Sequence, residues 1–295
     1  MAKINKSDAT GRALEYVIVK EILKSSINLK CDKKTLDAQS RDKAKYETLS
    51  ESLKTKYMKS AKKILEWLKG SYGIKDSDTI IIRRISDDEA KKGNVTDIEV
   101  NFISKRINLS IKHNHSALKH QRPSALPQQC GFPKKSIDDK SYREYYKLIC
   151  FNFVVRARKL ISNAKLFDEL KIADESFIDD NLYYPICALV CEKINLWGEN
   201  SFNTTSFFSF IVGMTNYYKI IVRDNSIEIL KFNDVALPTK MTATLKDKSY
   251  VLVKFNNSWE ISMRIHTASS RIIGVSQKFD TQPVKIDVQK EILKF

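Results

Sequence analysis

The sequence predicts an α/β fold in which a mixed central sheet is flanked by helices and followed by a β-rich C-terminal part. Three observations predict it. The first third of the chain carries apolar residues at helical spacing, residues 97–112 alternate polar and apolar side chains, and short β-branched and aromatic runs follow Tyr217. We therefore expect a core formed by residues 1–215 and a β-rich region, 216–295, packed against it.

Each element follows from its local pattern. Helical spacing predicts helices over 12–25, 43–69 (ending at Gly70), 142–161, 182–197 and 204–213. Alternation and β-branched runs predict strands over 79–82, 97–102, 107–112, 219–222, 227–232, 250–255 and 259–265. Polar turns at 104–106 and 256–258 predict two hairpins, and three prolines predict loop structure over most of 113–140.

Composition excludes several classes of protein. The 295 residues are 42% hydrophobic, which is typical of globular proteins. No apolar run reaches the roughly 18 residues of a membrane span, and the first six residues lack the apolar core of a signal peptide, so we expect a cytoplasmic protein. Glycine is scarce, with 8 residues and no GxGxxG or GxxxxGK motif, which argues against a P-loop NTPase.

The cysteines are odd in number and scattered. Five cysteines without CxxC spacing indicate reduced thiols rather than disulfides or a zinc ribbon. Cys187 and Cys191 stand four apart on an expected helix, a spacing that suits either metal binding or burial in the core. The aromatic run 202–210 has the same two interpretations, base stacking or a core face, and its helical spacing favours the core.

The net charge of +16 favours a nucleic-acid partner, because lysine and arginine release counterions when they neutralise phosphates. The alternative is a lysine-rich proteome encoded by an AT-rich genome, in which such residues simply accumulate. Charge alone does not choose between the two.

The hairpin 97–112 carries the strongest chemical pattern. Side chains alternate along a strand, so Asp97 begins one strand on the face where Ser110 and Lys112 end the other. Phosphodiester hydrolysis uses such a pair: a carboxylate to hold Mg²⁺, and a lysine to orient or deprotonate the attacking water. The arrangement resembles the PD-(D/E)xK nucleases, with Ser110 where a second carboxylate normally stands.

Three blocks resemble the HaeIII family of type II restriction endonucleases. The longest, at 109–120, reads LSIKHNHSALKH and is followed by Arg122. The opening block, at 11–16, reads GRALEY, and the late block, at 259–270, reads WEISMRIHTASS. The family motif itself has serine at the position of Ser110.

This resemblance implies a PD-(D/E)xK restriction-endonuclease-like core and Mg²⁺-dependent cleavage of double-stranded DNA at a short palindrome, GGCC by resemblance. It further implies a two-fold homodimer and a host methyltransferase that protects the same sites. Asp97, the carbonyl of Ile111 and Glu15 would hold the metal ion, with Lys112 and Ser110 beside them. Glu15 could equally be an ordinary carboxylate on a helix surface.

Three of the four histidines, His113, His115 and His120, fall within the longest block. Too few further ligands stand nearby for a zinc site, so we expect His113 at the catalytic centre and the other two at DNA, with packing as the alternative. Arginine suits base reading and lysine suits phosphate contact. The remaining residues expected at DNA are Lys119, Arg122, Arg264, His266 and Arg271.

Two other functions stay open. An inactive or non-specific DNA-binding relative would explain the missing carboxylate. A repair or RNA nuclease of the same fold would keep the chemistry without a discrete target.

Overall fold

The computed structural model describes residues 6–25, 28–85, 95–102 and 105–295. It contains two compact units that are interleaved along the chain. Unit 1 comprises 1–116, 214–235 and 288–295, and unit 2 comprises 117–213 and 236–287. Unit 1 takes segments from three parts of the chain, including the last eight residues, because its sheet is completed by strands from distant segments.

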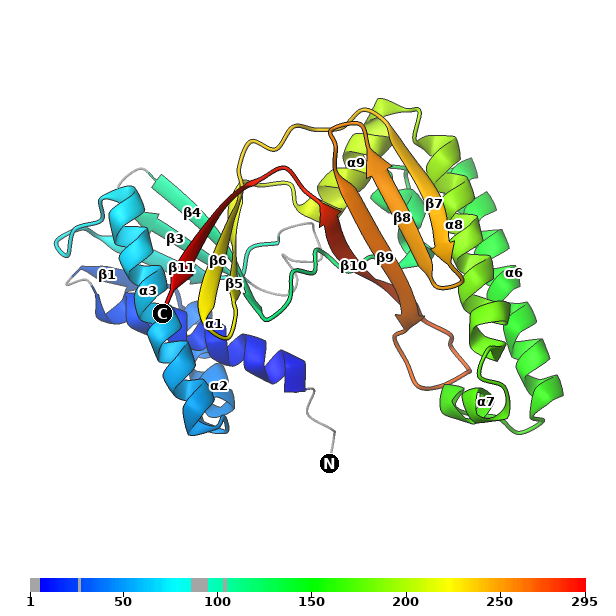
Figure 1. Ribbon diagram of the computed structural model, residues 1–295, viewed down its shortest axis with the longest axis horizontal. Helices are drawn as coiled ribbons and strands as arrows, with labels where there is room; N and C mark the ends of the chain where they lie inside the picture. Colours follow the sequence, from blue (N-terminus) through cyan, green and yellow to red (C-terminus); the bar gives the residue numbers. More distant parts are fainter. Residues whose placement is uncertain (1–5, 26–27, 86–94, 103–104) are drawn as a thin grey trace. The chain divides into compact units, whose positions relative to one another are not determined.

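Unit 1 is a mixed α/β layer structure, as the sequence predicts (Figure 1). Its seven-stranded sheet has the order β1-β2-β3-β4-β5-β6-β11, in which β1–β2 and β4–β5 are parallel and the other neighbours antiparallel. Its elements are α1 (Lys6–Lys24), β1 (Leu29–Cys31), α2 (Lys33–Glu47), α3 (Glu51–Tyr72), β2 (Ile80–Arg84), β3 (Ile98–Phe102), β4 (Lys105–His113), β5 (Tyr217–Val222), β6 (Ser226–Phe232) and β11 (Gln289–Lys294).

The core of unit 1 lies between this sheet and the helices α1 and α3. Leu14, Ile18 and Ile64 from the helices pack against Leu109 and Ile220 from the strands. The expected hairpin is confirmed, since β3 and β4 pair antiparallel with Ile98 opposite Leu109. Ser104 of the expected turn lies outside the described residues.

The helices α1 and α6 begin several residues before their expected starts, at Lys6 and Ile137, and the helix expected over 43–69 differs at both a break and its end. The single helix expected over 43–69 is two helices, because the Ser50 side chain accepts a hydrogen bond from the Leu53 amide and starts α3 anew. Gly70 does not end α3. The helix continues to Tyr72, and Gly73 ends it with a left-handed φ of 66°.

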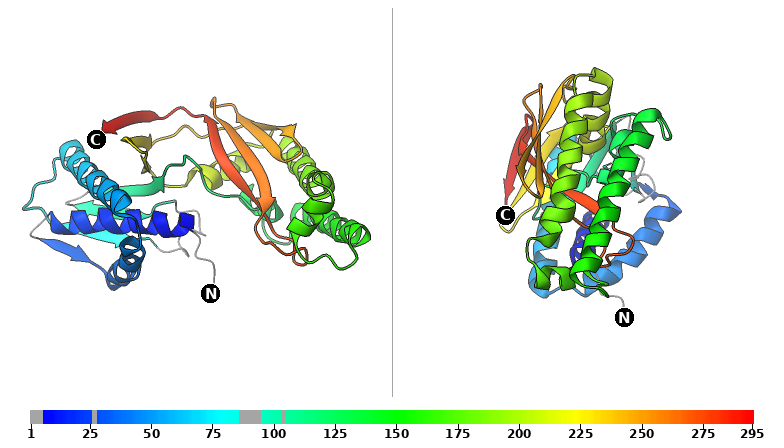
Figure 2. Two further views of the ribbon diagram at one scale, coloured as in Figure 1. Left: turned by 60° about the horizontal axis from the view of Figure 1, so that its bottom comes forward. Right: turned by 90° about the vertical axis from the view of Figure 1, so that its right-hand side faces the viewer.

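Unit 2 packs helices against an antiparallel sheet (Figure 2). The strand order in this sheet is β10-β9-β8-β7. The helices α8 and α9 lie against this sheet and α6 packs against α8. The elements are η1 (Pro123–Ala125), α5 (Leu126–Gln129), α6 (Ile137–Leu160), α7 (Phe167–Ala173), η2 (Asp179–Tyr183), α8 (Tyr184–Trp197), α9 (Ser201–Val212), β7 (Met241–Asp247), β8 (Tyr250–Phe255), β9 (Glu260–Thr267) and β10 (Gln277–Lys285).

Unit 2 contains the cysteine pair and the aromatic run, each of which had two interpretations from the sequence. Cys187 and Cys191 are both buried on α8, and all five cysteines are free thiols. Phe207 and Phe208 are buried on α9, where Phe208 meets the Trp259 ring edge-on with centroids 5.1 Å apart, so these two rings belong to the core, whereas Phe202 of the same run is exposed. None of the helices in the described ranges has the length and apolar character needed to cross a bilayer.

Candidate active site

Asp97 is the centre of a cluster of polar groups at the start of β3. One of its carboxylate oxygens, Oδ2, accepts hydrogen bonds from the Ile111 amide at 2.6 Å, from Lys112 Nζ at 3.2 Å and from Ser110 Oγ at 3.3 Å. The pairing of Ile98 with Leu109 produces this arrangement, because it places Asp97 opposite Ser110. The structure therefore brings together Asp97, Ser110 and Lys112.

Glu15 reaches the same region from α1, where it is only 7% exposed. Its carboxylate is paired with Arg84 of β2 and lies 3.5 Å from Arg12 Nη1. Burial, and then the negative charge of Asp97, raise the pKa of Glu15 to about 7. Two carboxylates close enough to repel each other thus lie at this edge of unit 1.

These groups fit Mg²⁺ by their chemistry. Among the described residues no group of three or more His, Cys, Asp or Glu side chains is placed to hold a metal ion. A site built on Asp97 and Glu15 would therefore depend on two carboxylates supplemented by main-chain oxygens. Such a set of hard oxygens suits Mg²⁺, which keeps several of its waters, and a divalent cation would offset the repulsion between the two acids.

Lys219 belongs to this site, although it was not expected there from the sequence. On β5 it pairs in register with Ser110, so that its side chain shares a face with Ser110 and Lys112. It is 2% exposed, and its Nζ donates to the Ser116 carbonyl at 2.5 Å. Burial, reinforced by the charge of Lys112, lowers the pKa of Lys219 to about 7. A lone lysine within the apolar strand YYKIIV was the available signal.

His113 lies on the other face of β4 from Lys112. Its ring packs edge-on against Tyr57 of α3, with centroids 5.4 Å apart. Burial and the nearby Lys56 lower the pKa of His113. The described contacts thus connect His113 to α3 rather than to Asp97, whereas His115 is exposed on the same unit.

The other residues expected at DNA all belong to unit 2, and three of them form one group. Arg264 and His266 stand two residues apart on β9 and so share a face, and they pair with Asp280 and Lys278 of β10 respectively. His120 Nδ1 lies 3.1 Å from the Phe279 carbonyl oxygen and 3.9 Å from Asp280 Oδ1. Burial, then the charge of Lys278, lower the pKa of His266. We call His120, Arg264, His266 and Lys278 the β9–β10 basic group.

Three further residues of unit 2 lie apart from that group in their contacts. Arg122 is exposed and donates to Ser276 Oγ at 3.0 Å. Arg271 is exposed in the segment after β9. Lys119 is half-buried, with Nζ 4.3 Å from the centre of the Phe210 ring, and burial lowers its pKa.

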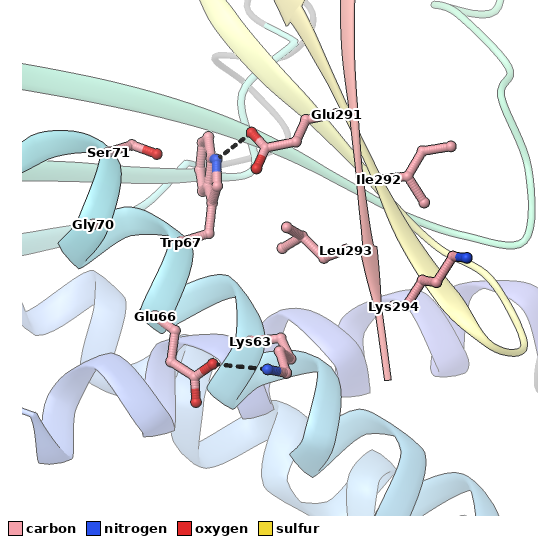
Figure 3. Close-up of a pocket in the computed structure, with 9 residues that line it drawn as sticks. All are labelled: Lys63, Glu66, Trp67, Gly70, Ser71, Glu291, Ile292, Leu293 and Lys294. Carbon is pink, nitrogen blue, oxygen red and sulfur yellow. Dashed lines mark hydrogen bonds and ion pairs between the residues drawn. The ribbon is translucent and has the colours of Figure 1, made fainter.

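A separate depression of about 550 Å³ lies between α3 and β11 in unit 1 (Figure 3). Trp67 Nε1 donates to Glu291 Oε2 at 2.9 Å within it. It contains none of the residues expected at the active site, and the polar cluster at Asp97 is the stronger candidate for chemistry.

Comparison with known proteins points to one family. A family model described as HaeIII restriction endonuclease matches residues 11–233 and 226–287. The chain is also 28% identical over 317 aligned positions to the type II restriction enzyme HaeIII of Haemophilus aegyptius, covering 96% of this chain and 95% of that protein. No solved structure matches the chain.

Proposed function

This chain belongs to the HaeIII restriction endonuclease family, and we propose that it cuts double-stranded DNA at a short palindromic site as a Mg²⁺-dependent type II restriction endonuclease. The observation that supports the chemistry is the pair formed by Asp97 and Lys112, whose Oδ2 and Nζ lie 3.2 Å apart. A carboxylate beside a lysine on adjacent strands is the arrangement of the PD-(D/E)xK nucleases.

In this proposal Asp97, Glu15 and the Ile111 carbonyl would hold Mg²⁺, which would supply a Lewis acid for the scissile phosphate and would lower the pKa of the attacking water. Lys112 orients the attacking water and offsets the negative charge that develops on the phosphate. The Ser110 hydroxyl and the Ile111 amide hold the Asp97 carboxylate through their hydrogen bonds. In this proposal Ser110 therefore holds the metal-binding carboxylate of Asp97, and it does not act as a metal ligand in place of a second carboxylate.

The β9–β10 basic group of unit 2 contacts the DNA in this proposal, together with His115, Lys119, Arg122 and Arg271. Arginine bonds two guanine acceptors at once, so Arg264 and Arg271 are proposed to read bases in the sequence GGCC. A palindrome is read most simply by a two-fold homodimer, with one active site for each strand. A cytoplasmic location and a methyltransferase that protects host sites complete the proposal.

The experiment is digestion of unmethylated phage DNA with Mg²⁺, followed by sequencing of the fragment ends. We expect discrete fragments from the wild type and a rate at least about 10²-fold lower for Lys112→Ala. Lys105→Ala is the matched control, because Lys105 stands at the other end of the same strand. It should cut like the wild type.

The alternatives predict other results. Specific binding of one sequence without cleavage by the wild type would show an inactive relative. Cleavage without discrete fragments, or of RNA, would show a repair or RNA nuclease. Either result would contradict the proposed function.

A further inference from the structure

Arg84 ends β2 with its guanidinium buried between two helices, and its side chain is only 3% exposed. Its Nη2 donates to the Glu15 carboxylate of α1 and, at 3.1 Å, to Asp42 Oδ2 of α2. Its Nη1 donates to Gln39 Oε1, also of α2, at 3.1 Å. One side chain thus links the carboxylate of Glu15 to a second helix.

The α2 side of this link is held independently of Glu15. Asp42 is fully buried and accepts two hydrogen bonds of 2.9 Å from Arg41. Although burial opposes ionisation, these hydrogen bonds and the charge of Arg84 hold the pKa of Asp42 below its usual value. Gln39 in turn donates to the Tyr16 carbonyl at 3.1 Å. Arg84 is therefore fixed from one side while it holds Glu15 on the other.

We propose that Arg84 is a positioning residue that fixes the Glu15 carboxylate for binding of the divalent cation. A glutamate side chain has several rotatable bonds, and ordering it on metal binding costs entropy. A guanidinium that is already anchored removes part of that cost, as partners of metal ligands commonly do. The inference rests on the proposed function, because it requires Glu15 to be a ligand.

The test measures Mn²⁺ binding by the full chain, through the loss of the electron paramagnetic resonance signal of free Mn²⁺. We expect Arg84→Met to raise the Kd for Mn²⁺ on the order of tenfold. Arg84→Lys keeps the charge but cannot donate in the same fork, so it should raise the Kd by about threefold. Thermal melting identifies the variants that fold.

Arg83→Met is the matched control. Arg83 precedes Arg84 on β2, points to the opposite face and approaches Asp32 and Glu99 at 3.7 Å and 3.5 Å. A general effect of losing an arginine from β2 would appear in both variants. We expect a wild-type Kd for Arg83→Met.

A double-mutant cycle with Glu15→Gln tests whether Arg84 acts through Glu15. If it does, Arg84→Met combined with Glu15→Gln should have the same Kd as Glu15→Gln alone. The double variant removes the charges of both Arg84 and Glu15, so it leaves no unpaired Glu15 carboxylate in the interior. Together with Arg84→Lys it provides the test even if Arg84→Met does not fold.

Two results would overturn the inference alone: wild-type Mn²⁺ affinity in folded Arg84→Met or Arg84→Lys, or a double variant that binds more weakly than Glu15→Gln. In both cases Asp97→Asn would still lose Mn²⁺ binding. Unchanged Mn²⁺ binding by Asp97→Asn would instead overturn the metal site of the proposed function, and this inference with it.

Discussion

One carboxylate oxygen of Asp97 accepts all three hydrogen bonds described for the candidate site. Loss of a single donor should therefore lower the cleavage rate less than loss of the Asp97 carboxylate itself. Ser110→Ala removes the longest of the three, at 3.3 Å, and leaves the other two. We expect its cleavage rate to fall by less than about tenfold, because this hydrogen bond is long and the Ile111 amide and Lys112 still hold the carboxylate. Asp97→Asn should lower the rate by more than about 10²-fold. Similar losses in single-turnover cleavage by the two variants would contradict the ranking.

Lys219 gives a prediction for stability against pH. Its pKa is lowered to about 7 by burial, whereas an unfolded lysine titrates near 10.4. Between these values the unfolded chain holds a proton that the folded chain lacks, so this residue makes folding more favourable as pH rises from 7 to 10. Lys219→Met removes the penalty and should raise the free energy of unfolding at pH 7, by up to about 4 kcal/mol.

The gain from Lys219→Met should shrink as the pH approaches 10, which urea denaturation at several pH values measures. Lys246→Met, at an exposed lysine of β7, is the control and should show no such pH dependence. A constant difference between Lys219→Met and wild type from pH 7 to 10 would contradict the assigned cause.

At the scale of elements, two glycines near the end of α3, Gly70 and Gly73, should respond in opposite ways to substitution by alanine. Gly70 lies within the helix, and a Cβ there would meet nothing within 4 Å, so Gly70→Ala should stabilise the protein by about 0.5–1 kcal/mol. Gly73 has equally open surroundings but a φ of 66°, so Gly73→Ala should destabilise by about 1 kcal/mol. Thermal melting of both variants checks the signs, and a shared sign would contradict the observed helix end.

Local sequence patterns predicted the elements in which the alternation of polar and apolar residues matches the buried and exposed faces. The β3–β4 hairpin, and with it Asp97, Ser110 and Lys112, could be predicted because strand alternation fixes which side chains share a face. The strand β11 could not, because its sequence QKEILK is mostly exposed and polar and it forms only by pairing with β6. Arg84 and Lys219 were missed for a related reason: their roles depend on distant partners, the helix α2 and the strand β4.

At the scale of the whole molecule, the residues expected in catalysis and most of those expected at DNA belong to different units. Asp97, Lys112 and Glu15 belong to unit 1, whereas the β9–β10 basic group belongs to unit 2. If these groups serve catalysis and recognition respectively, variants should separate the two functions. Lys112→Ala should bind a GGCC duplex about as tightly as wild type in Ca²⁺, and Arg264→Ala should bind it more weakly.

The dependence of binding on salt distinguishes the two ways in which Arg264 can contact DNA. A net charge of +16 predicts that affinity falls steeply as salt rises, because each phosphate contact releases counterions. If Arg264 contacts a phosphate, Arg264→Ala should weaken GGCC and unrelated duplexes alike and reduce the salt slope by about one. If it reads a guanine, the variant should lose about 1–3 kcal/mol on GGCC only, which relaxes specificity. Arg158→Ala, at an exposed arginine of α6, is the control, and an equal loss there would show that Arg264 acts only through net charge.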